Sequence, residues 1–301
     1  MHVTFRQLRL FLALADTGSV SAAARAMHVT QPTASMQLRE VADAVGVPIY
    51  EVVARRVHLT QAGRELARTA RAMVDEWASF AQRIDSMKGL TRGRLRVAVV
   101  STAKYFVPRL LGTFCAVHPD IDISLEVLNR DGVVARLREN LDDLYVMSMP
   151  PDDVDLDDEV FMPNPLVAIA PAAHLLAARR RPFALEALRD ERFIHREPGS
   201  GTRMATDAHF RAHGFAPRVR LELGSNEAIR EAVAGGLGIA VLSVHALGHR
   251  GTRDGVAVLP VRGFPIRSAW HLVRPRGKRL SPIAEVFRRH LAEQADARAA
   301  R

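Results

Sequence analysis

Three short stretches of the sequence combine hydroxyl, amide and cationic side chains in a way that suits an anion. They are Ser101-Thr102 with Lys104, Ser200 to Arg203 with Thr202 between them, and Ser225-Asn226. Side chains of this kind bind phosphate or carboxylate oxygens where a helix N-terminus presents free backbone N–H groups. Each stretch lies at the start of a predicted helix or loop, so the expected chemistry is reversible binding of a small anion.

The alternative for each stretch is simple helix capping, which explains any one of them taken alone. Three stretches at one edge of a sheet favour a ligand site. The predicted anion-binding residues are Ser101, Thr102, Lys104, Arg196, Ser200, Thr202, Arg203 and Asn226. We expect Arg203 to dominate charge recognition, because a planar guanidinium fits phosphate or carboxylate and the sequence suggests no carboxylate partner for it.

No set of residues in the sequence can be assembled into a catalytic centre. Segment 199–203 lacks the Gly-Lys-Ser/Thr ending of a Walker A loop, and Pro198 breaks a G-x-S-x-G pattern around Ser200. Asp142 and Asp143 are adjacent, so their carboxylates should point apart. We therefore expect a binding protein with no catalytic residue, metal or cofactor, and not an enzyme.

The remaining reactive residue types have plainer explanations. Cys115 is the only cysteine, which excludes an intramolecular disulfide, and we expect it to be a small core residue. We expect His195 to be exposed or hydrogen-bonded. The acidic run 152–159 is expected to be a solvated loop.

From residue 90 onward, short apolar segments alternate with helical ones, which is typical of parallel sheets covered by helices. The predicted strands are 95–100, 121–127, 144–147, 167–170, 193–194, 220–223, 239–242 and 269–273, and helices are predicted at 104–117, 132–140 and 282–293. Crossings at 162–165 and 263–265 predict two subdomains, I (90–162 and 267–301) and II (163–266). Ligands of such sheets bind at the carboxyl ends of strands, where the anion-binding stretches fall.

Residues 1–60 predict short helices followed by a hairpin. Apolar residues recur at helical spacing on both sides of Gly18, and Thr30 with Pro32 begins a third helix. That helix would bury Ala34, Leu38 and Val41. Segments 46–50 and 57–59 are predicted to be the two strands of the hairpin, which would form a wing.

The outward face of the third helix carries side chains that can read DNA bases. Glutamine can pair with adenine, threonine or methionine can contact a thymine methyl, and arginines at the wing tip can reach phosphates or a minor groove. The predicted DNA-binding residues are Thr30, Gln31, Pro32, Thr33, Ser35, Met36, Gln37, Arg39, Arg55 and Arg56. Taken alone, these residues also fit an ordinary solvated helix.

Residues 61–89 predict one long helix, because only Gly63 interrupts the helical pattern. Its apolar stripe consists of Leu66, Ala70, Met73, Trp77, Phe80 and Ile84. Such a helix would be about 40 Å long, which is more than a small domain needs. We therefore expect the stripe to pack against a second copy of the chain. The alternative is a helix folded back on its own domain.

The formal charge of +9 over 301 residues favours an anionic partner but does not identify it, since scattered surface arginines give the same sum. No apolar run approaches the roughly 18–20 residues of a membrane span, and the N-terminal residues lack the apolar core of a signal peptide. We expect a cytoplasmic protein that is not attached to a membrane.

Two sets of motifs resemble one protein family. SVSAAARAMHVTQPTASMQLREV, followed by RRVHLTQAG, resembles the winged helix-turn-helix of LysR-type transcriptional regulators. STAKYFVPRLLG, NLDDLYVMSMPP, HREPGSGTRMATDAHF and LGSNEAIREAVAGGLGIAVLS resemble the effector domains of those LysR-type regulators that control Calvin-cycle (RuBisCO) operons. Met36 departs from the Arg or Lys that the family often carries there, and Val41-Ala42 from its usual Leu-Glu.

The resemblance implies an α/β protein with an N-terminal winged helix-turn-helix (1–60), a long linker helix (61–89) and a two-subdomain, periplasmic-binding-protein-like effector domain (90–301). Its implied partners are double-stranded promoter DNA, further copies in a homodimer or tetramer, and RNA polymerase. The implied effector is a small anion, such as a phosphorylated sugar or a nucleotide of carbon metabolism. A regulator of another operon and a solute-binding protein remain alternatives, and the missing export signal disfavours the second.

Overall fold

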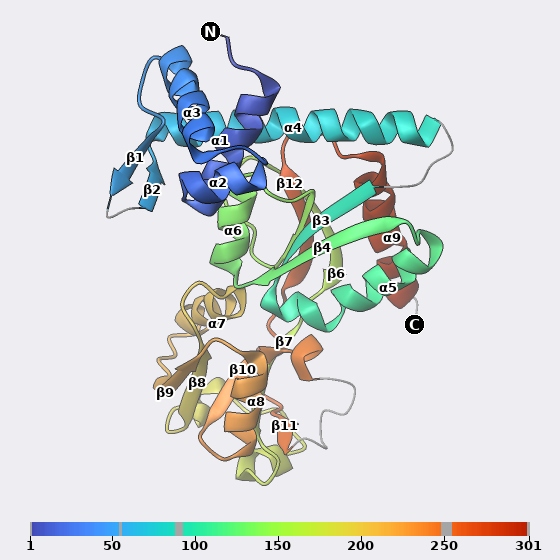
Figure 1. Ribbon diagram of the computed structural model, residues 1–301. Coiled ribbons are helices and arrows are strands. Elements are labelled where there is room, and N and C mark those ends of the chain that lie inside the picture. Colours follow the sequence, from blue (N-terminus) through green and yellow to red (C-terminus); the bar gives the residue numbers. More distant parts are fainter. Residues whose placement is uncertain (1, 54–55, 88–92, 248–254, 300–301) are drawn as a thin grey trace. The chain divides into compact units, whose positions relative to one another are not determined.

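The computed structural model of the chain describes residues 2–53, 56–87, 93–247 and 255–299 (Figure 1). The chain divides into two compact units. Residues 1–89 with 139–141 form the first unit, and residues 90–138 with 142–301 form the second.

The first unit consists of helices and a hairpin. Its elements are α1 (Phe5–Thr17), α2 (Val20–Ala26), α3 (Gln31–Val45), β1 (Tyr50–Val53), β2 (Arg56–Leu59) and α4 (Gln61–Met87). Thr4 and Gln7 cap the start of α1 reciprocally, each side chain accepting the other's backbone N–H. Gly18 ends the helix at a φ of 63°, which glycine adopts without steric cost.

One apolar core joins these elements. Ala34, Leu38 and Val41 of α3 are buried in it, as predicted. The first predicted wing strand, 46–50, is wrong, because Gly46 caps the end of α3 at a φ of 84° and β1 begins only at Tyr50. β1 and β2 pair antiparallel.

Helix α4 is tied to the hairpin at its start. The Thr60 hydroxyl donates to the Pro48 carbonyl (2.7 Å) and accepts the Gly63 N–H (3.0 Å). Gly63 lies directly against the Ile49 backbone, where a β-carbon would overlap the carbonyl group. The glycine that only interrupts the helical pattern in the sequence therefore permits this close approach.

The second unit contains two sheets, each with helices on both faces. The sheet of lobe I has the order β4-β3-β5-β12-β6, with β3 (Gly93–Val100), β4 (Ile121–Leu128), β5 (Leu144–Met147), β6 (Leu156–Pro163) and β12 (Ala269–Pro275). α5 (Val107–Val117) and α9 (Pro282–Ala299) lie on one face and α6 (Arg130–Arg138) on the other (Figure 1). β3, β4 and β5 run parallel, as the alternation of strands and helices predicted, whereas β12 is antiparallel to both of its neighbours.

The sheet of lobe II has the order β11-β7-β10-β8-β9. Its strands are β7 (Leu166–Pro171), β8 (Arg192–Arg196), β9 (Arg218–Leu223), β10 (Ile239–Ser243) and β11 (Val256–Val258). α7 (Gly201–Ala212) and α8 (Asn226–Ala234) cover its opposite faces. β7 is antiparallel to β10 and β11, so this sheet is also mixed.

The chain crosses between the lobes twice, and the two crossings are hydrogen-bonded to each other. Leu166 and Ile266 exchange backbone hydrogen bonds, and Asn164 donates its N–H to the Ser268 carbonyl (2.8 Å). The Asn164 side chain is buried and accepts from the Ser243 hydroxyl (2.7 Å). The first crossing lies at the predicted segment 162–165, and the second lies at 266–268, directly after the predicted segment 263–265. The predicted boundaries of the domains stay predictions.

Gly63 and Gly112 are a matched pair for testing the packing of α4. We expect Gly63→Ala to lower the free energy of unfolding of the first unit by about 1–3 kcal/mol, because the added methyl overlaps the Ile49 carbonyl. Gly112 of α5 has no neighbour within 4 Å of an added Cβ, so Gly112→Ala should stabilise the second unit by about 0.5–1 kcal/mol. Denaturant unfolding followed by circular dichroism measures both changes. Equal effects of the two substitutions would contradict the close approach at Gly63.

Candidate functional site

The exposed face of α3 carries the residues predicted to read DNA. Gln31, Pro32 and Arg39 are exposed, and Met36 keeps 56% of its surface accessible. Thr33, Ser35 and Gln37 are half-buried, and Thr30 is exposed at the N-cap. Exposure of an apolar methionine side chain to water does not stabilise the fold, and such a side chain can contact a thymine methyl group. The described side chains form one surface at the N-terminal half of the helix.

The hairpin adds one described cation to this unit. Arg56 begins β2 and is exposed, whereas Arg55 lies outside the described residues. The Val57 N–H donates to the Gly18 carbonyl (3.1 Å), so β2 is fixed to the turn between α1 and α2. The hydrogen bond therefore fixes the position of the strand that carries Arg56.

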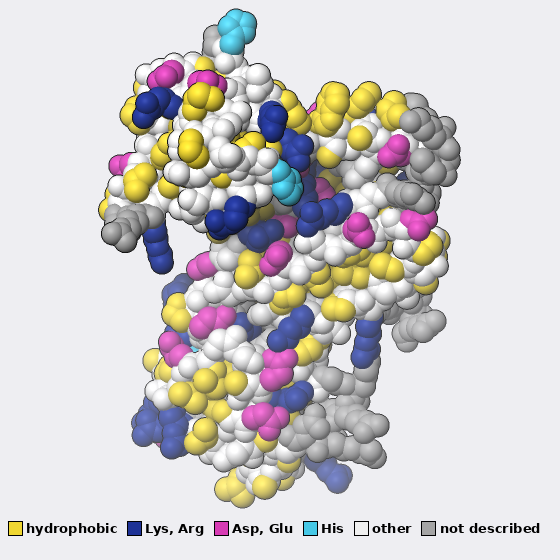
Figure 2. All heavy atoms as spheres, in the orientation of Figure 1, with side chains coloured by type: hydrophobic (Ala, Val, Ile, Leu, Met, Phe, Trp, Pro, Cys, Tyr) yellow, Lys and Arg dark blue, Asp and Glu magenta, His cyan; other side chains and the backbone are white. Residues whose placement is uncertain are grey.

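The apolar stripe of α4 is divided between two environments. Ala70 is buried and Leu66 is half-buried in the core of the first unit. Farther along the helix, Met73, Trp77 and Phe80 are 50, 62 and 46% exposed, and Figure 2 shows hydrophobic side chains gathered over α4. The Trp77 ring lies 5.6 Å from that of Phe80 and 6.1 Å from that of Phe5 of α1. The prediction that the whole stripe packs against a second copy is therefore wrong for Leu66 and Ala70.

The predicted anion site lies where the two lobes touch. The Arg196 guanidinium of lobe II donates to the Ser101 hydroxyl of lobe I (3.2 Å), and the Asn226 amide donates to the Thr102 hydroxyl (3.1 Å). Lys104 Nζ lies 3.0 Å from the Glu227 carboxylate. Three polar contacts thus bridge the cleft, and five of the eight predicted residues take part in them.

Arg196 is the most completely satisfied of these groups. Its side chain is 2% exposed, and it forms two hydrogen bonds with the Glu197 carboxylate at 2.7 and 2.9 Å. It also donates to the Asn226 carbonyl oxygen at 2.7 Å. A buried guanidinium requires such partners, since an unpaired buried charge is strongly destabilising.

The expectation that Arg203 has no carboxylate partner is wrong. Its guanidinium pairs with Asp207 (2.7 Å) and with Glu222 (2.8 Å), and it donates to the Arg196 carbonyl (2.9 Å). These partners come from α7, β9 and β8, so Arg203 fixes α7 to the sheet. The structure places it behind Arg196 as a supporting residue.

Ser200 and Thr202 begin α7 and are both buried. Ser200 caps the helix by accepting the Arg203 N–H, which is the simple explanation that the sequence left open. Gly199 and Gly201 lie against Asp131 and Ser148 of lobe I, where a Cβ would not fit. The glycines of this loop therefore serve a close approach between the lobes.

Two carboxylates in the cleft were not foreseen from the sequence. Glu197 follows Arg196, and Glu227 lies in the first turn of α8 directly after Ser225-Asn226. Burial acts to raise the pKa of Glu227, but hydrogen bonds from Lys104, its own amide and Ser225 lower it to about 2. The signal that could have found Glu227 is an acidic residue next to a capping serine, which is favourable at a helix N-terminus.

His195 is neither exposed nor hydrogen-bonded, so the prediction for it is wrong. It lies on β8 with only 5% of its surface exposed. Neither ring nitrogen has a hydrogen-bond partner among the described residues. Burial, and then the positive charge of Arg203, lower its pKa. Cys115, predicted to be in the core, is partly exposed on α5.

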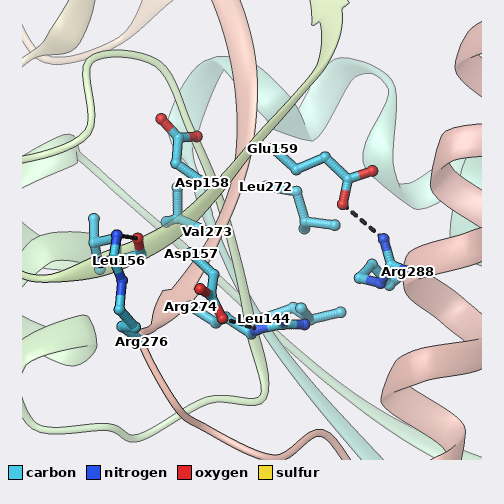
Figure 3. Close-up of a pocket in the computed structure, with 10 residues that line it drawn as sticks. All are labelled: Leu144, Leu156, Asp157, Asp158, Glu159, Leu272, Val273, Arg274, Arg276 and Arg288. Carbon is cyan, nitrogen blue, oxygen red and sulfur yellow. Dashed lines mark hydrogen bonds and ion pairs between the residues drawn. The ribbon is translucent and has the colours of Figure 1, made fainter.

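The acidic run 152–159 is a solvated loop only in its first part, because β6 begins at Leu156. Its carboxylates line a hollow of about 490 Å³ on lobe I, where Asp157 pairs with Arg274 (2.9 Å) and Glu159 with Arg288 (2.8 Å) (Figure 3). Ion pairing thus neutralises this hollow. Asp142 and Asp143 bind different arginines, as their divergent directions predicted.

Two histidines lie side by side on α7. His209 and His213 of α7 are four residues apart, a spacing found in metal-binding helices, and their rings lie 4.3 Å apart. Within the described ranges, no group of three or more His, Cys, Asp or Glu side chains is arranged to hold a metal ion. None of the helices described there could cross a membrane.

Comparison with known proteins covers both units. Residues 5–64 match the bacterial regulatory helix-turn-helix proteins of the lysR family, and residues 88–296 match the LysR substrate binding domain. The chain is 42% identical over 290 residues to the RuBisCO operon transcriptional regulator of Acidithiobacillus ferrooxidans, which covers 96% of this chain and 94% of the relative. It is 41% identical over 286 residues to the HTH-type transcriptional activator CmpR of Synechocystis, covering 95% and 94%.

A solved structure resembles the second unit. The regulatory domain of Synechocystis CcmR in complex with 2-PG shares 48% of its residues with this chain at a TM-score of 0.66, over 68% of this chain and 98% of that one. The winged helix-turn-helix and the two-lobed domain are those that the motifs predicted, and the relatives are regulators, not enzymes. The chain belongs to the LysR family of transcriptional regulators.

Proposed function

We propose that this regulator controls carbon dioxide fixation genes in response to a small anionic metabolite. The observation that carries the proposal is the similarity, over nearly the whole of both chains, to a regulator named for the RuBisCO operon. A LysR-type regulator of another operon is the alternative. RuBisCO genes transcribed divergently beside this gene would favour the first.

The DNA-reading surface in this proposal is the exposed face of α3 with Arg56 of the wing. Side chains near the N-terminus of a recognition helix reach base edges, and wing cations reach the backbone. The predicted DNA-binding residues stay a proposal. Arg55, which neighbours Arg56, is part of it from sequence alone.

The oligomer in this proposal is a dimer through α4, with two dimers forming a tetramer. Trp77, Phe80 and Phe5 form an exposed aromatic cluster on the first unit. Large apolar side chains gathered at one place are covered in most proteins by a partner. Two copies would present two reading surfaces to a promoter in the cytoplasm, with RNA polymerase as the partner that senses the outcome.

The effector in this proposal binds between the lobes, at Ser101, Thr102 and Lys104 on one side and Arg196 and Asn226 on the other. The CcmR domain that resembles this unit was solved with 2-PG, which supports a small ligand for this one. A phosphorylated sugar or a nucleotide remains within the proposal. Because these side chains also bond to one another across the lobes, a ligand with unequal affinity for open and closed lobes would shift their populations.

Substituting Gln31 tests the reading surface. We expect Gln31→Ala to weaken binding to the cognate promoter by about 1–3 kcal/mol and to leave binding to random DNA unchanged, because a base contact carries sequence information. Arg56→Ala should weaken both and flatten the dependence on salt. Gln61→Ala, an exposed glutamine on α4, is the control. Band-shift titrations in which all three variants match the parent would refute the orientation of α3.

Substituting Trp77 tests the oligomer. A glutamate at this position would put a charge into an apolar contact, so Trp77→Glu should yield smaller particles by light scattering at micromolar concentration. Ala72→Glu adds the same charge at an exposed position of α4 away from the aromatic cluster and should leave the mass unchanged. If Trp77→Glu keeps the parental mass, the aromatic cluster does not join two copies.

Substituting Thr102 tests the cleft. Thr102→Val keeps the shape and removes the hydroxyl, so binding of 2-PG to the full-length chain should weaken about tenfold or more in calorimetry. Thr113→Val removes a hydroxyl on α5 that bonds Leu110 and His290, and should leave binding unchanged. Promoter binding without ligand should survive in both variants. Unaltered binding of 2-PG by Thr102→Val would place the ligand elsewhere.

A further inference from the structure

The Glu227 carboxylate already holds the kind of position that an anionic ligand would take in the cleft. Its two oxygens lie 3.0 and 3.1 Å from Lys104 Nζ, and one of them accepts the Ser225 hydroxyl at 2.9 Å. It lies in the first turn of the nine-residue helix α8, where free N–H groups favour negative charge. An ammonium group, a hydroxyl and a helix N-terminus thus converge on one internal anion.

The Glu227 carboxylate can be exchanged for a ligand anion, unlike the Glu197 carboxylate beside Arg196. The Lys104 and Glu227 side chains are 35 and 41% exposed, whereas the Arg196 side chain is 2% exposed. Solvent screens a pair that is exposed to this degree, so its separation costs little. Lys104 is therefore the cation of the cleft whose internal partner a ligand anion can replace.

Burial raises the pKa of the neighbouring Tyr105 phenol, and the Glu227 carboxylate raises it further, so the phenol keeps its proton. Lys104 Nζ lies 5.4 Å from the centre of the Tyr105 ring. Because its pKa is lowered to about 2, Glu227 is ionised at neutral pH. The donors around Glu227 are thus held by a permanent negative charge.

We propose that Glu227 is an internal counter-anion, which a ligand must displace from Lys104 and which thereby selects ligands of higher negative charge. This inference rests on the proposed anion site between the lobes. A free monocarboxylate that replaces a tethered carboxylate gains no charge and loses translational freedom. A phosphate group carries about −1.5 to −2 charges and three acceptor oxygens, so it gains contacts in the exchange.

The same exchange links ligand binding to the contact between the lobes. Glu227 belongs to lobe II and Lys104 to lobe I, so the pair is one of the three polar bridges of the cleft. A ligand anion bound by Lys104 releases α8 from this bridge unless the ligand itself contacts α8. The two states then differ in the anion that Lys104 binds, which is Glu227 in one and the ligand in the other. A switch requires such a difference between its states.

The test compares the full-length parent, Glu227→Gln and Glu231→Gln in thermal-shift titrations at pH 8 and constant ionic strength. Glu231 lies on the same helix, is 73% exposed and, among the described residues, pairs with Arg230 at a distance of 3.9 Å, so its variant matches the change in net charge. The probes are inorganic phosphate, acetate and 2-PG. We expect Glu227→Gln to respond to phosphate at about fivefold lower concentration than the parent, and to gain a response to acetate.

Further variants keep the result interpretable. Glu227→Asp retains the charge on a shorter side chain and should lie between the parent and Glu227→Gln, which covers the case in which Glu227→Gln does not fold. Adding Lys104→Met should abolish the gained response, because the freed cation is then missing.

Each outcome decides a separate point. A parent that responds to 2-PG, together with a Glu227→Gln variant no more sensitive to phosphate than Glu231→Gln, overturns the counter-anion and leaves the proposed site standing. A weaker response of Glu227→Gln also overturns it, since Glu227 would then accept hydrogen bonds from the ligand. A gain for phosphate without any parental response to 2-PG supports the counter-anion and removes 2-PG as ligand. No response of any protein to any probe refutes both.

Discussion

The buried guanidinium of Arg196 is the group on which the effector domain depends most. Glu197, Asn226 and Ser101 satisfy it, and its hydrogen bond to Ser101 is one of the contacts between lobe II and lobe I. The Arg203 guanidinium donates a hydrogen bond to the Arg196 carbonyl and forms ion pairs with Asp207 and Glu222. A charge buried this completely would be strongly destabilising if one partner left, so the surrounding loop and helix starts are fixed by it.

The buried apolar cores stay within each lobe, whereas the lobes meet through the polar contacts of the cleft and through the His245 ring, which lies 5.4 Å from that of Phe106 and 6.0 Å from that of Trp270. The buried core of lobe I is built on β3, β5 and α5, and the described members of the lobe II cores come from segments between Leu166 and Ile266 alone. Hydrogen bonds across the cleft can be exchanged for bonds to a ligand at a small net cost. Separate cores with polar bridges therefore allow the lobes to move as bodies while each stays folded.

In the first unit, the apolar face of one helix has two parts with different environments. Helix α4 uses one part of its apolar face to complete the core around α1 and leaves Met73, Trp77 and Phe80 uncovered. Gly63 lets the start of the helix touch Ile49 beside the wing. The helix that carries the exposed cluster is thereby fixed to the wing of the same unit. An oligomer formed through α4 would therefore hold two DNA-reading surfaces at a defined spacing.

The sequence by itself determined the helix-turn-helix, the long helix and the alternation of strands and helices, because hydrophobic period and capping are local properties. Ala34, Leu38 and Val41 repeat at helical spacing and are buried. Only the tertiary structure decided that β12 runs antiparallel and that 156–163 forms a strand, because both depend on neighbours distant in the chain. It also decided that Arg203 supports Arg196 and that Glu227 faces Lys104, 123 residues away. Charge pairing between lobes is set by distances in space, which residue types and spacing do not encode.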